Sequence, residues 1–345
     1  FNPVDRDSQN RQFVTDLSWT RGSHNIKTGF NFIRSQNNIF NIRHEIGTYN
    51  YNGRFTGDGM ADFLLGMTSA YTYQTRIQVQ LRQALWAGYV NDDWKVTPKL
   101  TLNMGVRYEF LQPWVDNKNR LGVFDITTDP DNPQLFFAEG TTSFTRAGYR
   151  SDKNNFMPRV GFAYKLSDKT VVRSGYGIFY AYMEPYGDAQ YLIGNPPNAY
   201  GVGLQSSADQ AAVILRDGPA AGSLELENAT GLTFSSYNRE PELSYAQQWN
   251  FNIQHELGDN WLFETGYSGS RGAHLLRRYD GNFSPPGPGN INAKRRYSSA
   301  SIPGTDIVSS PLGQVIYYNQ DGNSFYHSWV SKIEKRFSSG FTLLG

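Results

Sequence analysis

The sequence has no cysteine among its 345 residues. Zinc–thiolate centres, iron–sulfur clusters, thiol nucleophiles and disulfide frameworks are therefore all excluded. The sequence also has no run of about 18 apolar residues, which rules out a membrane-spanning helix. The sequence also has no large excess of charge of either sign, because 32 basic and 31 acidic residues leave a net charge of +1. This balance gives no electrostatic reason to expect nucleic acid as a partner.

Aromatic residues and glycine are abundant instead. Aromatic side chains make up 15% of the residues and there are 34 glycines, although hydrophobic residues reach only 39%. A soluble helical protein normally contains more Leu and Ala and less Tyr, Phe and Gly. The composition therefore favours β structure that exposes many aromatic side chains.

Short polar turns recur along the chain, each between two segments in which apolar and polar residues alternate. Gly, Pro, Asn, Asp and Ser are the residues that close tight hairpins. The five predicted turns are 21–23, 97–99, 167–169, 258–260 and 338–340. The strands expected around them are 11–20 with 24–34, 84–96 with 100–110, 156–166 with 170–182, 244–257 with 261–274, and 325–337 with 341–345.

Long polar connections separate these hairpins, at 35–83, 111–155, 183–243 and 275–324. If the strands are neighbours in chain order, every short turn lies at one end of the sheet and every long connection at the other. Outer-membrane barrels sort their connections in this way, whereas a soluble sandwich has no reason to do so. We therefore predict an all-β fold, an antiparallel transmembrane β-barrel with long extracellular loops, of which about ten strands are present. The segment DGMADFLLG at 58–66 is expected to form a short apolar or helical plug.

The hairpin YVNDDWKVTPKLTLNMGVRYEF, residues 89–110, predicts two different faces of the sheet. Residues directly opposite each other share a face, so the pairing follows once the turn is centred on Pro98. The apolar pairs are Trp94–Leu102, Val90–Val106 and Trp86–Phe110, and the polar pairs are Tyr89–Arg107, Asn91–Gly105 and Asp93–Asn103. Strict alternation points Asp92 to the apolar side. Either Asp92 lies near a membrane interface, or a β-bulge turns it inward.

The strand faces also supply the candidate site residues. The candidate lumen-facing residues are Asp93, Arg107, Arg159 and Arg173. Their arginines could form a basic stripe that contacts a plug domain or an anionic substrate, or they could form ion pairs between strands with partners such as Glu109. The candidate lipid-facing or girdle residues are Trp19, Trp94, Val106 and Trp261. Three of these are tryptophans beside tight turns, where a periplasmic aromatic girdle is expected.

Other chemistry receives little support from the sequence. Asp92, Asp93 and Glu109 could be imagined as glycosidase carboxylates, but an interfacial Asp92 beside a lumen-facing Asp93 explains them more simply. The five histidines are too scattered for a metal-ligand motif. The sequence thus predicts no enzyme, no catalytic residue, no metal site and no cofactor. Tyrosines of the long connections could stack on a glycan or peptide, or pack within the loops; they include Tyr191, Tyr200 and Tyr237.

The hairpin at 89–110 resembles the Y-x-x-D-x-W…L-T-L-N-x-G-x-R-Y signature of TonB-dependent outer-membrane receptors. Four further segments resemble the Oar-like branch of that family: ADFLLG, NNFMPRVGFAYKL, VVRSGYGIFY and QQWNFNIQHELGDNWLFETGYSGSRGAHL. The matches run from about residue 12 to the C-terminus and keep one order. The resemblance implies a ~22-stranded barrel, plugged by an N-terminal domain, that imports a nutrient with energy relayed by TonB. On this basis residues 1–345 are expected to be a barrel fragment that lacks the plug and the last strands.

The leading hypothesis is therefore a receptor and transporter barrel in the outer membrane of a Gram-negative-type cell. Its expected partners are outer-membrane lipid, the TonB complex through a missing N-terminal region, and a scarce nutrient such as a glycan, a peptide or a metal chelate. Two alternatives stay open. One is a non-transport outer-membrane barrel for adhesion or surface architecture, and the other is a secreted all-β binding domain.

Overall fold

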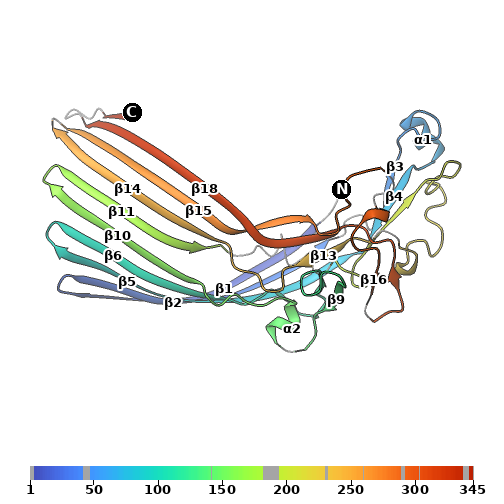
Figure 1. Cartoon of the computed structure of the whole chain (residues 1–345), viewed down its shortest axis with the longest axis horizontal. Coiled ribbons are helices and arrows are strands. Elements are labelled where there is room, and N and C mark those ends of the chain that lie inside the picture. The colour runs from blue at the N-terminus through green and yellow to red at the C-terminus, as the bar shows by residue number, and fades with distance from the viewer. Residues whose placement is uncertain are drawn as a thin grey trace.

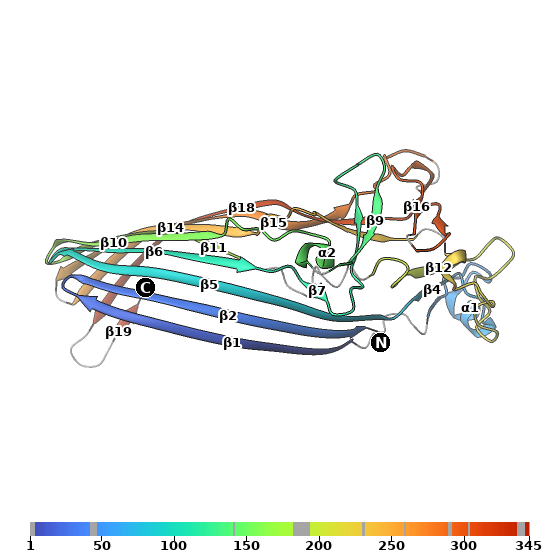
Figure 2. The same ribbon diagram turned by 90° about the horizontal axis from the view of Figure 1, so that it is seen from below.

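The computed structural model describes residues 4–41, 47–140, 142–181, 194–229, 232–258, 260–288, 292–302, 304–336 and 342–344. Its main element is a 12-stranded sheet that curves like part of a barrel wall (Figures 1 and 2). Most of its strands are antiparallel neighbours in chain order: β1 (Val4–Arg21), β2 (His24–Asn41), β5 (Ile77–Thr97), β6 (Leu100–Leu111), β10 (Phe156–Ser167), β11 (Thr170–Tyr180), β14 (Tyr245–Gly258), β15 (Trp261–Asp280), β18 (Val315–Arg336) and β19 (Thr342–Leu344). Within the described residues β1 pairs only with β2, so the sheet is open.

Tight turns join these strands in pairs at one end of the sheet, on the left of Figure 1. Four of the predicted turns are confirmed, and two contain positive backbone φ angles, at Gly22 (58°) and Asn260 (65°). The fifth, 338–340, lies outside the described residues, although β19 pairs with β18 beyond it. The predicted separation of short and long connections is therefore found in the structure.

The long strands extend further from the turns than the alternation predicts. β1 and β2 have 18 residues each, β5 has 21 and β18 has 22. A tilted strand needs only about 9–11 residues to cross a bilayer. The sheet therefore continues well beyond the thickness of a membrane, on the side away from the tight turns.

The long connections fold at that far end into what we call the loop layer. It contains the helices α1 (Gly59–Leu65) and α2 (Ser143–Ala147), and two single-turn 3-10 helices (Leu226–Asn228 and Asn292–Lys294). No helix among the described residues is long and apolar enough to cross a membrane. The short strands are β3 (Thr48–Asn50), β4 (Ala70–Gln74), β7 (Val115–Asp116), β8 (Gly122–Asp125), β9 (Gln134–Phe137), β12 (Gly201–Gln205), β13 (Phe234–Tyr237), β16 (Ala300–Ser301) and β17 (Val308–Ser309). Of these, β7 and β13 join the main sheet, β7 by pairing with β5 beyond the end of β6 and β13 by pairing with β18.

The segment expected to be an apolar or helical plug is the helix α1. The side chain of Asp58 caps its N-terminus by accepting hydrogen bonds from the backbone N–H groups of Met60 and Ala61. Gly66 ends the helix in the left-handed conformation. Met60, Leu64 and Leu65 are exposed, so α1 does not plug into any other described part of the chain.

A hydrophobic core holds the loop layer onto one face of the sheet. It joins Val79 and Leu81 of β5 to loop residues such as Trp114 and to Tyr237 of β13. Tyr237 is completely buried, so the suggestion that it stacks on a glycan or peptide is wrong, because its ring is already packed against Tyr149. Tyr200 is half-buried, and Tyr191 lies outside the described residues.

Candidate functional site: the polar face of the sheet

The pairing of β5 with β6 creates one apolar and one polar face. Every pair predicted around Pro98 is present, from Trp86–Phe110 to Trp94–Leu102 on one face and from Tyr89–Arg107 to Asp93–Asn103 on the other. The register is unbroken from Leu85 to Lys95 and shifts only in the last step before the turn. Because the pleat alternates regularly along this stretch, residue parity alone decides the face on which each side chain lies.

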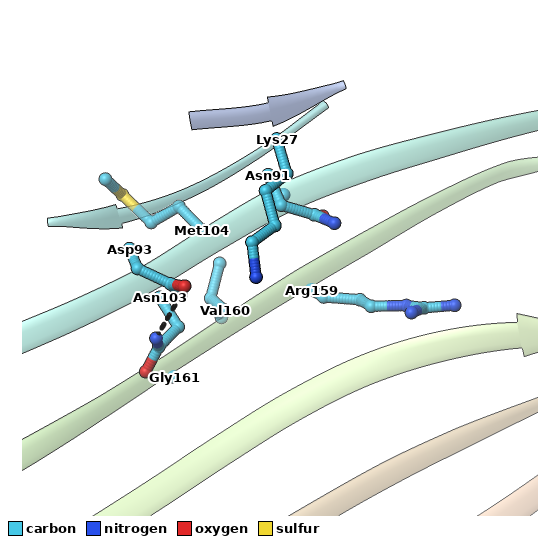
Figure 3. Close-up of a pocket in the computed structure, with 9 residues that line it drawn as sticks. Lys27, Asn91, Asp93, Asn103, Met104, Arg159, Val160 and Gly161 are labelled. Atoms are coloured by element: carbon cyan, nitrogen blue, oxygen red, sulfur yellow. Dashed lines mark hydrogen bonds between the residues drawn. The ribbon is translucent and has the colours of Figure 1, made fainter. Parts of the chain in front are cut away.

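A groove of about 320 Å³ lies on the polar face, across four neighbouring strands (Figure 3). Lys27 of β2, Asn91 and Asp93 of β5, Asn103 of β6 and Arg159 of β10 surround it. The Nδ2 of Asn103 donates a hydrogen bond to Oδ1 of Asp93, 2.6 Å away. The groove is therefore an open, polar depression with cationic and anionic groups on its rim.

Glycines form the floor of this groove. Gly105 lies between Asn91 and Arg159 in the register, and Gly161 lies beside Asn103. A methyl group at Gly105 would overlap the side-chain oxygen of Asn91, which lies across it. The same arrangement occurs on two other strand pairs, with Asp16 over Gly29 and Asn252 over Gly266.

The three candidate arginines do not form one stripe. Arg107 and Arg159 are diagonal neighbours, because Gly105 is opposite Arg159. Arg173 lies closer to the tight turns, opposite Ala163. The Nε of Arg107 is 2.5 Å from Oε1 of Glu109, so the expected ion pair exists, but it joins residues of one strand rather than two.

Arg159 has a different contact, since its guanidinium lies 4.7 Å from the ring centre of Phe179 on β11. Figure 3 shows its side chain extended beside the groove. Such a stack leaves the guanidinium edge able to donate hydrogen bonds. Of the three, Arg159 is the one that lines the groove.

The apolar face carries the predicted girdle residues. Trp19, Trp94 and Trp261 all lie within a few residues of the tight turns, and Val106 lies further along β6. Trp94 stacks on His24 with ring centres 5.1 Å apart, and the Nζ of Lys335 lies 4.7 Å from the ring centre of Trp261. These four residues share one face of the sheet, opposite the groove.

Asp92 also lies on the apolar face, so the β-bulge alternative is wrong. Its Oδ2 is 2.6 Å from Nδ1 of His24, directly after the first tight turn. The acid on this face is therefore accompanied by a polar partner and lies close to the turn end of the sheet. The sequence could not reveal this partner, because β2 and β5 are separated by a long connection.

The loop layer contains cavities that the sequence did not predict. One, of about 580 Å³, is lined by Thr127, Thr128, Arg150, Asn238, Arg239 and Glu240. A second, of about 300 Å³, shares Asn238 and Glu240 and adds Glu242, His274 and Asp321. Both are lined mainly by polar side chains. Among the described residues, no group of three or more potential metal ligands comes together.

Asp125 anchors the wall of the larger cavity. Burial by itself would raise the pKa of this carboxyl, but hydrogen bonds from Thr128 and Thr127 outweigh it and lower the pKa to about 2. Arg239 adds an ion pair, with Nη1 3.2 Å from Oδ2. The carboxylate is therefore charged at neutral pH and holds this part of the loop layer in place.

A curved antiparallel sheet with one apolar face, one polar face and connections sorted by length defines part of a transmembrane β-barrel. The chain belongs to the outer membrane beta barrel domain family, whose model matches residues 1–345. The all-β barrel fold and the location in a Gram-negative outer membrane, both predicted from the sequence, are thereby confirmed.

Several solved structures are similar to the chain, and one with a TM-score above 0.5 shows the fold. The chain is similar to the outer membrane transporter YddB from Escherichia coli, with 14% identity and a TM-score of 0.51 over 96% of this chain and 31% of that one. It is also similar to the siderophore receptor PirA from Acinetobacter baumannii, with 9% identity and a TM-score of 0.46 over 97% and 35%. For the ferric yersiniabactin uptake receptor FyuA from Yersinia pestis, the values are 10% and 0.45 over 99% and 35%.

The chain thus spans about a third of the length of these solved proteins. They are outer-membrane transporters and receptors, not enzymes. No curated protein sequence matches the chain.

Proposed function

We propose that this chain is part of the barrel of a TonB-dependent receptor of the Oar-like branch, which binds a scarce nutrient outside the cell and imports it. The observation that carries the proposal is the polar face in the lower half of the sheet, whose groove around Arg159 lies on the same side of the sheet as the loop layer. Its polar side chains offer a solute contacts along the lower half of the sheet. The ordered motifs from NNFMPRVGFAYKL to SGSRGAHL add support from the resemblance.

The polar face is assigned to the barrel lumen, and the apolar face to lipid. The loop layer covers only the odd-numbered side of β5, where Val79 and Leu81 are fully buried. The long external loops of a barrel fold over its mouth, so the face that they cover continues below as the lumen. Asp93, Arg107, Arg159 and Arg173 then face the lumen, while Trp19, Trp94, Val106 and Trp261 face the membrane.

A plug domain and the TonB complex are the proposed partners in import. We assign all of residues 1–345 to the barrel domain, so the plug and the TonB-binding segment belong to other parts of the full-length protein. The nutrient is a glycan, a peptide or a metal chelate, and its route passes the polar cavities of the loop layer before it reaches the groove.

The import proposal is tested in cells that carry the full-length gene, its deletion, or a deletion of the TonB component. Growth is compared with a polysaccharide, a peptide mixture or a ferric siderophore as the limiting nutrient. We expect the two deletions to give the same defect on one of these three nutrients. Equal growth of all strains on every nutrient, with loss of surface attachment in the gene deletion, overturns import.

A variant of the groove refines this test. Arg159→Gln should reduce uptake of the identified nutrient severalfold without loss of barrel assembly, because Arg159 lines the groove without pairing to an acid there. Arg216→Gln is the control, since Arg216 lies in the loop layer and pairs only with its neighbour Asp217 in the described structure. Normal uptake by Arg159→Gln would remove this residue from the proposed route.

The assignment of the two faces has its own test. Arg at Val106 should hinder membrane assembly, with a cost of about 2–4 kcal/mol near the midplane. Arg at the adjacent Gly105 is limited instead by space on the polar face, where Asn91 lies across the glycine. Heat-modifiable migration of the full-length protein from the outer-membrane fraction measures assembly. Equal assembly of Val106→Arg and wild type would falsify the lipid-facing assignment.

One observation favours the non-transport alternative, a barrel for adhesion. Helix α1 exposes Met60, Phe63, Leu64 and Leu65 at the outer end of the loop layer (Figure 1), where they could contact another surface. The deletion experiment separates this alternative from import. The secreted all-β domain is not supported, because the family is an outer-membrane one.

A further inference from the structure

Three arginines gather on the apolar side of the sheet, just beyond its apolar region. Arg11 of β1 lies directly opposite Arg34 of β2, and Arg34 lies opposite Ala84 of β5. Arg82 lies two residues from Ala84, on the same face and diagonal to Arg34. Figure 2 shows the three strands side by side along one edge of the sheet.

A row of aromatic rings marks the boundary below these arginines. Phe13, Phe32, Trp86 and Phe110 lie opposite one another in the register, and the Trp86 ring centre is 5.5 Å from that of Phe32 and 5.7 Å from that of Phe110. Along β5, eight residues separate this row from Trp94 at the tight turns (94 − 86). That is roughly 26 Å of strand, or about 20 Å of height at the tilt usual in such barrels. The two aromatic rows therefore bracket an apolar band of about 20 Å, close to the roughly 25 Å band of such barrels.

The arginines consequently lie at the level of the lipid head groups of the outer leaflet. Arg11 and Arg34 each lie two residues from the upper aromatic row, on the side away from the tight turns, and both are exposed. The loop layer covers the opposite face of these strands, where Ile39 and Val79 are buried. The described loops thus leave the arginine side of the sheet open to the membrane.

Charge at this position is not balanced by the described protein. Like charges directly opposite each other in a sheet are destabilising, and Arg11 and Arg34 have no ion pair among the described residues. Their neighbours on this face are glutamines and phenylalanines, Gln9, Gln36, Phe13 and Phe32. Further along β1, Asp7 already accepts a hydrogen bond from Asn38, which in turn accepts one from Arg82. An anion between Arg11 and Arg34 would turn their repulsion into attraction.

We propose that Arg11, Arg34 and Arg82 bind the phosphate groups of the phosphorylated glycolipid of the outer leaflet. Guanidinium groups pair with phosphate oxygens in a planar, bidentate geometry. Basic groups at a membrane surface recognise anionic lipid head groups in the same manner. The inference rests on the proposed lipid-facing assignment, because only an outward face meets this lipid.

The test uses the full-length protein, extracted from outer membranes and stripped of lipid in a neutral detergent. It is incubated with diphosphoryl lipid A or with fully dephosphorylated lipid A, and bound lipid is counted by native mass spectrometry. We expect at least tenfold more binding of the phosphorylated form. We also expect this preference to fall to within about twofold in the variant R11Q/R34Q/R82Q. Arg216→Gln removes one charge from the loop layer and should bind like wild type.

Several results would overturn the proposal. The first is equal binding of both lipids by wild-type protein that is still heat-modifiable. This result overturns the proposal without the need for any variant. That result leaves the lipid-facing assignment standing, since Val106→Arg tests it separately. If the triple variant does not assemble, R34Q alone and the conservative R11K/R34K/R82K decide. The site is contradicted if R34Q keeps the wild-type preference for the phosphorylated lipid. It is also contradicted if the lysine variant loses this preference as completely as the glutamine variant and R216Q loses it equally.

Discussion

The two halves of strand β5 are apolar on opposite sides of the same sheet. Near the loop layer, the odd-numbered Val79 and Leu81 are fully buried, whereas near the tight turn the even-numbered Val90 and Trp94 form the apolar surface. The pairing with β2 runs from Ile77 to Trp94 without a register shift. The pleat therefore stays the same while its surroundings change. The upper half packs against a protein core, and the lower half, in the assignment proposed above, meets lipid.

Alternation therefore identifies a strand without identifying which side of the sheet is the inside. In the upper half the apolar side is the covered, loop-layer side, as in a soluble protein. In the lower half the apolar side is the other one. The switch between Leu85 and Trp86 marks the height at which the environment changes, and substitutions on either side of it should have opposite consequences.

The largest effect is expected for Leu81→Arg. An unpaired charge in the core beneath the loop layer should cost about 3–5 kcal/mol, and this cost falls on the upper half of the sheet. Limited proteolysis should cut the loop layer while the lower barrel stays heat-modifiable. Leu81→Met, which keeps the volume and polarity of the site, is the control. A loop layer that resists protease in both variants would contradict the buried core.

A smaller effect is expected when the same charge is placed on the other face of β5 at two heights. Val90→Arg should cost about 2–4 kcal/mol because it faces the apolar band. Gln80→Arg lies on the same face in the upper half and should assemble normally. The fraction of folded protein in the outer-membrane pellet measures both. Equal defects in the two variants would mean that the environment does not change along the strand.

Acid should weaken the loop layer through Asp125. Its folded pKa of about 2 lies below the ordinary value of 3.8, so its contribution is complete above about pH 4 and is lost as the pH falls towards 2. The shift corresponds to about 2 kcal/mol. Asp125→Asn should show this loss of stability already at pH 7. The protease resistance of its loop layer should then change little as the pH falls from 4 towards 2. Asp217→Asn, at an exposed carboxylate, should leave the profile unchanged.

The smallest effect concerns the polar pair on the apolar face. His24→Leu leaves Asp92 without its partner and should reduce stability by about 1 kcal/mol. The double variant H24L/D92L should recover most of that loss, because an apolar pair suits this face. Urea denaturation of the full-length barrel in detergent measures all three proteins. Additive losses in the double variant would show that the two side chains act independently.

The hairpin register was predictable because it depends on local information. Apolar and polar residues alternate on both sides of Pro98, so only one pairing of the two strands keeps the faces separate. In that pairing Trp94 lies opposite Leu102 on the apolar face, and Asp93 lies opposite Asn103 on the polar face. The upper parts of β1 and β2 were not predictable, since segments such as SQNNIFN show no clean alternation. Their strands form because neighbouring backbones continue to pair beyond the membrane, whatever the side chains are.

The site was predictable only in part, for a related reason. Parity placed Asp93, Arg107 and Arg159 on one face, and the structure agrees. It could not show that Arg107 and Arg159 are diagonal neighbours, because their strands are joined by the connection 111–155, whose length does not set a register. The same limit hid the contact between His24 and Asp92. It also hid the burial of Tyr237, which depends on packing between distant loops.

The glycines opposite Asp16, Asn91 and Asn252 have a consequence for the bore of the barrel. Each of these polar side chains lies flat across the glycine of the next strand instead of projecting away from the sheet. At these three positions the flat side chains keep the polar face shallow, and in the lumen assignment proposed above they widen the bore there. In that assignment the wider bore favours the folded plug domain proposed above, and the inner surface still offers amide and carboxylate groups.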